Sequence, residues 1–129
     1  MDQQTPSPKP LVLVVEDHED SREMMRQLLE QAGMVVKAVA TAEDALRVAL
    51  SQTLAIVLTD VSLGGGVRDG VWLLTRLREA SLSVPVIAVT GRRERVDEFL
   101  EMGFAAVLVK PAVVDNLLAI IGDAIRRSS

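Results

Sequence analysis

The feature that most constrains this chain is an alternation of short apolar runs with stretches of helical spacing. Five such runs occupy residues 11–15, 34–40, 54–58, 84–89 and 105–109. Aliphatic runs of this length are typical of strands covered on both faces of a sheet. The run at 34–40 contains Lys37 and therefore predicts an edge strand.

Apolar residues also recur at the spacing of amphipathic helices between and after these runs. The stripes are Met25, Leu28, Leu29 and Ala32; Ala42, Ala45, Leu46 and Ala49; Gly70, Leu73, Leu74 and Leu77; Val96, Phe99 and Leu100; and Val114, Leu117, Leu118, Ile121 and Ile125. Thr41 with Asp44, and Asp69, are typical of helix N-termini. Gly33 and Gly103 predict helix ends.

The resulting (βα)₅ order predicts an α/β fold, with a parallel sheet covered by helices on both faces. Five units are too few for an eight-stranded barrel, so we expect an open, doubly wound sheet of five parallel strands. The 129 residues suffice for one domain with its own core. We assign residues 10–129 to this domain and residues 1–9, which are polar and contain prolines, to a flexible leader.

Composition excludes several classes of function. The chain has no cysteine and one histidine, which excludes disulfide frameworks, thiolate catalysis and cysteine zinc sites. The net charge of −4, the absence of a basic stripe and an aromatic content of 2% argue against direct nucleic-acid binding. No run approaches the roughly 20 apolar residues of a membrane span, and none forms a signal-peptide core. We therefore expect a cytoplasmic protein without membrane insertion.

Polar side chains capable of chemistry follow the predicted strands. Glu16 and Asp17 follow the first strand, Asp60 the third, Thr90 the fourth and Lys110 the fifth. The carboxyl ends of parallel strands meet at one edge of a sheet, so these groups should share a cleft. Three carboxylates repel one another, and oxygen ligands favour Mg²⁺ or a similar ion such as Mn²⁺. A cation, an ammonium and a hydroxyl suit a phosphoryl group, which predicts Asp60 as a nucleophile that forms an acyl phosphate.

Each of these residues also has an ordinary structural interpretation. Asp60 alone is typical of a helix cap or turn, and Glu16 and Asp17 belong to an acidic run that favours a helix N-terminus. Thr90 precedes a glycine and is compatible with a turn, while Lys110 precedes a proline and is compatible with a strand end. Their joint occurrence at strand ends favours the shared site.

Three further features have competing interpretations. His18 lies beside the acidic pair, either as a metal ligand or, preferably, as a partly exposed residue at the start of the first helix. The run Gly64–Gly66 lacks the spacing of nucleotide-binding loops, so we do not expect a nucleotide site there. Trp72 lies on the polar stripe of its helix, where it either anchors a partner or folds over its neighbours.

The motifs LVVEDHEDSRE, IVLTDVSL, VIAVTG and LVKP, in this order and spacing, resemble the receiver domains of two-component response regulators. The resemblance extends from about Pro10 to Arg127. It implies a flavodoxin-like, CheY-like sheet with strand order 2-1-3-4-5. By resemblance, Glu16 and Asp17 match the acidic pair that holds Mg²⁺, and Asp60 matches the phosphoacceptor, which is also a metal ligand.

The resemblance implies further roles around this site. Ser62 occupies the position that supplies a backbone carbonyl to the metal. Thr90 matches the switch hydroxyl, and Lys110 matches the lysine that pairs with the phosphoryl group. The bond from Lys110 to Pro111 is similar to one that is cis in the family. The side chains at Ser62 and Arg92 occupy positions that tune phosphate hydrolysis.

The chain departs from the family pattern in three places. Val107 stands where the family usually has Tyr or Phe as its second switch residue, so the usual coupling to Thr90 is in question. Gly64 replaces a common proline, and the stretch from there to the pair Asp69 and Gly70 is about two residues longer than usual. Glycine leaves the backbone unrestrained, so we expect the loop at residues 64–68 to be mobile.

These observations favour a phosphorylation-controlled switch. A sensor histidine kinase or phosphotransfer protein would donate the phosphoryl group, and an unidentified protein would read the switched surface around Thr90, Arg92 and Val107. The chain would not be an enzyme beyond its own phosphotransfer and autodephosphorylation, and it would be a monomer or weak dimer. Two alternatives are a receiver-shaped interaction module that works without phosphorylation and a small metal-dependent phosphatase.

Overall fold

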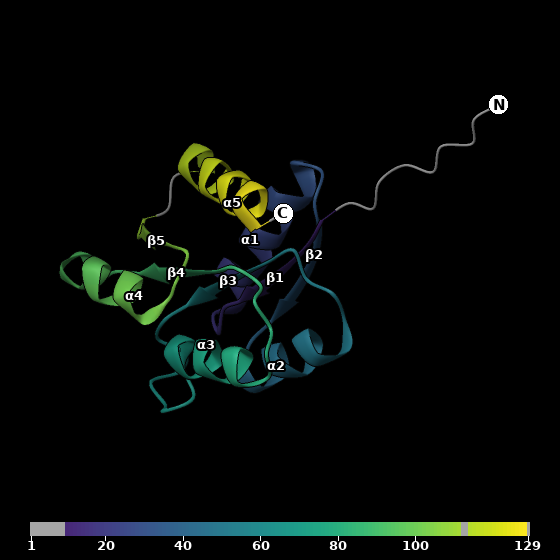
Figure 1. Ribbon diagram of the computed structural model, residues 1–129. Helices are drawn as coiled ribbons and strands as arrows, with labels where there is room; N and C mark the ends of the chain where they lie inside the picture. Colours follow the sequence, from purple (N-terminus) through teal and green to yellow (C-terminus); the bar gives the residue numbers. More distant parts are fainter. Residues whose placement is uncertain (1–9, 112–113, 129) are drawn as a thin grey trace.

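A five-stranded parallel sheet forms the centre of the protein, with helices on both of its faces (Figure 1). The computed structural model describes residues 10–111 and 114–128, so the predicted leader at residues 1–9 lies outside the described residues. The elements are β1 (Leu11–Val15), α1 (Glu19–Gln31), β2 (Val35–Val39), α2 (Ala42–Ser51), β3 (Ile56–Asp60), α3 (Gly70–Glu79), β4 (Val86–Thr90), the 3₁₀ turn η1 (Arg93–Arg95), α4 (Val96–Met102), β5 (Ala106–Val109) and α5 (Val114–Ser128). The strand order β2-β1-β3-β4-β5 confirms the predicted doubly wound sheet.

Two apolar clusters lie on opposite faces of this sheet, because successive side chains of a strand point to opposite sides. Val12 and Val14 face the cluster that includes Leu29 of α1 and Ile121 of α5. Leu13 belongs to the other cluster, which includes residues of α2, α3 and α4. Figure 1 shows α1 and α5 over one face and α2 and α3 over the other. The central strands are therefore covered on both faces, which explains their unbroken apolar sequences.

The predicted helix ends are confirmed. Thr41 Oγ1 accepts a hydrogen bond from the Asp44 N–H at the start of α2, with a donor–acceptor distance of 3.1 Å. Gly33 and Gly103 follow α1 and α4 with φ angles of +94° and +113°. Residues with a side chain rarely adopt this left-handed backbone conformation, so glycine ends both helices without strain.

Several predicted boundaries were wrong by one or two residues. β3 and β4 begin two residues later than the apolar runs, and their last residues are Asp60 and Thr90. These two residues thus lie within the ladder instead of following it. In the predicted helical stripes, Ala32 and Leu100 are exposed. In the short helix α4, the one fully buried side chain is that of Phe99. Within the part of the chain that the structure describes, no helix is long and apolar enough to cross a membrane.

Candidate functional site

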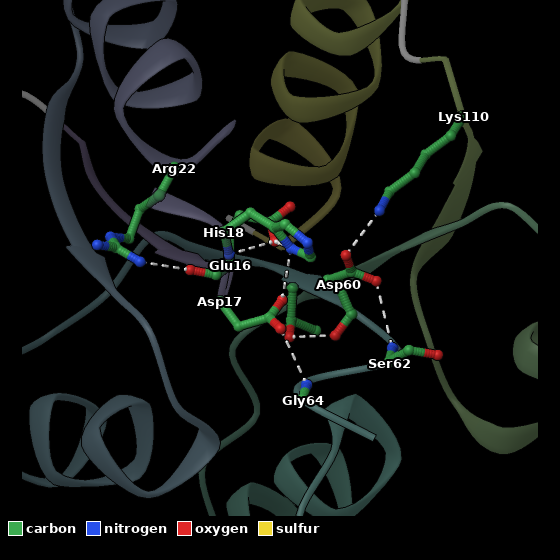
Figure 2. A network of polar contacts seen from close by, with 9 residues as sticks. Glu16, Asp17, His18, Arg22, Asp60, Ser62, Gly64 and Lys110 are labelled. Atoms are coloured by element: carbon green, nitrogen blue, oxygen red, sulfur yellow. Dashed lines mark hydrogen bonds and ion pairs between the residues drawn. The ribbon is translucent and has the colours of Figure 1, made fainter. Parts of the chain in front are cut away.

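The carboxyl ends of the sheet gather the side chains that the sequence analysis selected. Glu16 and Asp17 follow β1, Asp60 ends the adjacent strand β3, and Thr90 ends β4. Lys110 follows β5, and its backbone N–H donates to the Thr90 carbonyl across 2.8 Å. Figure 2 shows the acidic side chains and the Lys110 ammonium converging on one region.

Asp60 is the buried centre of this site, with 8% of its surface exposed. Its Oδ2 accepts a hydrogen bond from Lys110 Nζ at 2.7 Å, and its Oδ1 accepts from the Ser62 N–H at 3.2 Å (Figure 2). A buried carboxylate is costly unless it is paired and hydrogen-bonded. Lys110 and Ser62 meet that requirement and fix the direction of both oxygens.

The backbone of Asp60 is held by the start of α3. Gly70 follows the N-cap residue Asp69, whose Oδ1 accepts from the Trp72 N–H at 3.0 Å. A Cβ at Gly70 would lie 2.8 Å from the Asp60 carbonyl oxygen, so only glycine allows this approach. From the sequence, Gly70 was predicted only as a member of the apolar stripe of α3, and its contact with Asp60 was missed. A glycine directly after an aspartate N-cap, in a stripe of leucines, was the available signal.

Backbone amides orient the acidic pair. The His18 N–H donates to Glu16 Oε2 at 3.1 Å, and the Gly64 N–H donates to Asp17 Oδ2 at 3.1 Å. Arg22 Nη1 donates to the Glu16 carbonyl at 2.9 Å. The glycine-rich loop thus contacts the acidic pair through its backbone, a role that sequence reasoning missed.

The site also shifts the protonation equilibria of its members. Burial raises the pKa of Glu16, and the hydrogen bond shared with Asp17 and the charge of Asp60 add to the rise, although the His18 N–H opposes it. Burial alone would raise the pKa of Asp17. Its hydrogen bonds with Glu16, its own backbone and His18 outweigh this effect, so the pKa of Asp17 is lowered. Burial alone would lower the pKa of Lys110. The hydrogen bond to Asp60 and the negative charges of Asp60 and the acidic pair outweigh this effect, so the pKa of Lys110 is raised. The closely spaced negative charges therefore favour a cation.

The donor chemistry of the site fits a hard divalent cation, because carboxylate oxygens predominate. Among the described residues, the metal-ligating atoms of Glu16, Asp17 and His18 lie within 4.8 Å of one another. Asp60 is not part of this closest group, and its carboxylate is directed to Lys110 and Ser62. His18 lies at the start of the first helix, where it is the N-cap of α1, and its side chain is exposed.

The three residues expected at the switched surface differ in environment. Thr90 is 4% exposed, and its Oγ1 accepts from the Arg92 N–H at 2.9 Å. The exposed Arg92 side chain pairs with Glu94, Nε to Oε2 at 2.7 Å. Val107 is half-buried and packs against the apolar cluster under α2, α3 and α4. Val107 is therefore a core-facing residue of β5 in this structure.

Trp72 folds over its neighbours, the second of its two interpretations. It is half-buried and packs against the apolar cluster under α3. The guanidinium carbons of Arg68 and Arg76 lie 5.6 Å and 5.5 Å from the centre of its ring, within cation–π range. Arg68 also pairs with Glu43 of α2, Nη1 to Oε2 at 3.1 Å, and so connects the β3–α3 loop to α2.

Comparison with known proteins identifies the family. The model of the response regulator receiver domain matches residues 12–122. The chain belongs to this family of two-component signalling domains. The Lys110–Pro111 peptide bond is cis, as the resemblance predicted.

Similar sequences occur in a transcriptional regulator and in sensor histidine kinases. The chain is 36% identical over 110 residues to the transcriptional regulatory protein HprR of Escherichia coli strain K12, covering 84% of this chain and 48% of HprR. It is 32% identical over 123 residues to the sensor histidine kinase RcsC of Salmonella typhi, covering 92% of this chain and 13% of RcsC. The chain thus spans half or less of these relatives.

Solved structures support the fold. The receiver domain of the Francisella response regulator 1452 superposes with a TM-score of 0.86 at 24% identity, covering 94% of this chain and all of that one. The receiver domain of the sensor histidine kinase PA1611 from Pseudomonas aeruginosa PAO1 gives a TM-score of 0.80 at 26% identity, covering 92% and 99% of the two chains. That structure contains a magnesium ion coordinated in its active-site cleft.

Proposed function

We propose that Asp60 accepts a phosphoryl group from a phosphohistidine of a sensor histidine kinase or phosphotransfer protein, in a reaction that requires Mg²⁺ or Mn²⁺. The observation that carries this proposal is the buried Asp60 carboxylate, held 2.7 Å from Lys110 beside the acidic pair. Membership of the receiver family and the kinase and regulator relatives support the same exchange.

The carboxylates of Glu16, Asp17 and Asp60, with the backbone carbonyl of Ser62, would hold the metal ion. Oxygen ligands of this kind suit Mg²⁺, which retains part of its water shell. When bound, the ion would neutralise the combined negative charge of the carboxylates and the incoming phosphoryl oxygens.

The transfer step follows from the position of Asp60. A carboxylate oxygen of Asp60 forms a bond to phosphorus, and the phosphorus–nitrogen bond of the donor breaks. Its electron pair returns to the imidazole, which takes up a proton. Lys110 Nζ, now on Asp60 Oδ2, transfers its hydrogen bond to a phosphoryl oxygen, and the Thr90 hydroxyl is free to donate a hydrogen bond to another. Water later attacks the phosphorus, releasing inorganic phosphate and restoring the carboxylate.

The output would be a change in a protein-binding surface. Thr90 precedes η1 and α4, and its Oγ1 currently accepts the N–H of Arg92. If the Thr90 hydroxyl turns toward the phosphoryl group, this contact changes and the segment after β4 moves with it. Val107 would have to accommodate the movement from the core side of β5, and the exposed side chains of Ser62 and Arg92 would influence the hydrolysis rate.

Acetyl phosphate with Mg²⁺ provides the test. We expect intact-mass measurements to show one added phosphoryl group in the wild-type chain and none in Asp60→Asn. The exposed Asp97→Asn on α4 serves as a matched control and should be labelled like wild type. No added mass in wild type, or equal labelling of Asp60→Asn, would favour the non-phosphorylated interaction module. Sustained turnover of free phosphoesters would favour the phosphatase alternative.

A further inference from the structure

His18 is placed to contact both acidic side chains at the carboxyl end of β1. Its Nδ1 lies 3.4 Å from Asp17 Oδ1 and 3.5 Å from Glu16 Oε2. The imidazole extends over the acidic pair in Figure 2, and 78% of the side chain is exposed. The proposed function assigns no role to this ring.

The distances from His18 Nδ1 to the two carboxylate oxygens are close to the edges of a coordination sphere. Metal bonds of about 2.0–2.2 Å to imidazole nitrogen and carboxylate oxygen separate neighbouring ligands by about 3.0 Å in an octahedron and about 3.4 Å in a tetrahedron. The observed 3.4 Å and 3.5 Å lie at the upper end of this span. Rotation of an exposed imidazole by a small angle removes the remaining difference.

Both carboxylates are already oriented toward the ring by the backbone. The Gly64 N–H occupies Asp17 Oδ2 and leaves Oδ1 facing His18. The His18 N–H fixes Glu16 Oε2, the oxygen that lies near the ring of the same residue. Since an oriented ligand loses less freedom on binding a metal, this arrangement is partly preorganised.

We propose that His18 Nδ1 is an additional ligand, which makes this a mixed nitrogen–oxygen site that binds borderline transition-metal ions such as Co²⁺, Ni²⁺ or Zn²⁺. Imidazole suits these ions, whereas Mg²⁺ selects oxygen and gains little from a nitrogen ligand. On binding a metal, the ring takes the tautomer with its proton on Nε2, so that Nδ1 gives up its hydrogen bond to Asp17 Oδ1 and offers its lone pair to the ion. The inference rests on the proposed function only in taking Glu16 and Asp17 as metal ligands.

Calorimetric titration of the full chain with Co²⁺ alone and with Mg²⁺ alone tests this role. Most divalent sites bind Co²⁺ more tightly than Mg²⁺, so the informative quantity is the change that a substitution causes for each ion. We expect His18→Asn to weaken Co²⁺ binding by about tenfold or more and Mg²⁺ binding by less than about twofold. Asparagine suits the N-cap position of α1. Glu19→Gln, at the next residue and also exposed, should affect the two ions alike.

The visible absorption of bound Co²⁺ supplies a second measurement, because it responds to the ligand set. The wild-type spectrum should differ from that of His18→Asn at saturating Co²⁺. Unchanged Co²⁺ affinity in His18→Asn, or an equal loss for both ions, would overturn the proposal. Phosphorylation by acetyl phosphate in Mg²⁺ is measured separately: its absence in wild type refutes the proposed function and leaves the Co²⁺ comparison standing.

Discussion

Replacement of Gly70 by alanine should damage both the fold and the phosphoacceptor. The new Cβ would lie 2.8 Å from the Asp60 carbonyl oxygen and 3.0 Å from Val61 Cα, whereas ordinary contacts begin near 3.4 Å. Both neighbours are backbone atoms of β3 and the residue after it, so the start of α3 and Asp60 must separate by about 0.6 Å, the shortfall in the closer contact.

The cost follows from two opposing effects. Overpacking of this kind typically costs about 1–3 kcal/mol, and the better helix propensity of alanine returns at most about 1 kcal/mol. We expect Gly70→Ala to lower the free energy of unfolding by about 1–2 kcal/mol and the thermal midpoint by about 3–8 °C. Because the displaced residue is Asp60, labelling by acetyl phosphate should also slow by about tenfold.

Gly122→Ala is the matched control. Gly122 lies within α5, and among the described residues the atom outside the helix backbone that is nearest to an added Cβ is Arg126 Nη1, at 3.3 Å, the end of a flexible side chain. This substitution should leave stability unchanged or raise it by up to about 1 kcal/mol, with normal labelling. Thermal and urea unfolding by circular dichroism measure both variants. The reasoning fails if Gly70→Ala is as stable as wild type, or if Gly122→Ala loses as much.

Three further outcomes can be measured. Burial and the neighbouring carboxylates raise the pKa of Glu16, so its ionised form lowers the free energy of unfolding once the pH exceeds the unfolded pKa near 4.5. In the presence of a chelator, Glu16→Gln should therefore be more stable than wild type at pH 7. Unfolding titrations at a series of pH values should show that this advantage vanishes below pH 4.5. Lys110→Met removes the ion pair of the buried Asp60 and should lower metal-free stability by about 1–2 kcal/mol, a value reduced because the lysine is 44% exposed, with a smaller loss in Mg²⁺. Arg68→Ala uncovers the ring of Trp72, the chain's single tryptophan, so its fluorescence emission should shift to longer wavelength; an unchanged spectrum would contradict the stacking.

The strand pattern could be predicted because burial on both faces leaves a direct signature in the sequence. Its boundaries could not, since an apolar run reports burial and a strand is defined by hydrogen bonds. Leu54 and Ala55 extend the apolar run before β3 without belonging to the strand. Thr59 and Asp60 are polar yet pair within the ladder, where a hydroxyl bond to the Asp60 carbonyl and the ion pair with Lys110 allow their burial.

The candidate site was predictable to the extent that its chemistry resides in side chains. Asp60, Lys110 and the acidic pair were selected because parallel strands bring their carboxyl ends together, and the structure places them there. Trp72 was harder, because helical spacing placed it on a polar stripe. That stripe includes Arg76, whose guanidinium lies over the Trp72 ring, so a polar residue of the same stripe covers the tryptophan.

The N–H groups that position the acidic pair Glu16 and Asp17 belong to the backbone, and for that reason the sequence does not show these contacts. Asp17 receives its hydrogen bond from the Gly64 N–H, 47 residues away, and any residue except proline supplies an N–H. The family's usual proline at position 64 could not make this bond, whereas glycine does so. The departure that the sequence analysis regarded as a loosened loop thus supplies a donor to the acidic pair. Changes in this loop should therefore alter metal affinity although no ligand is replaced, because they change which oxygen of Asp17 remains available to the cation.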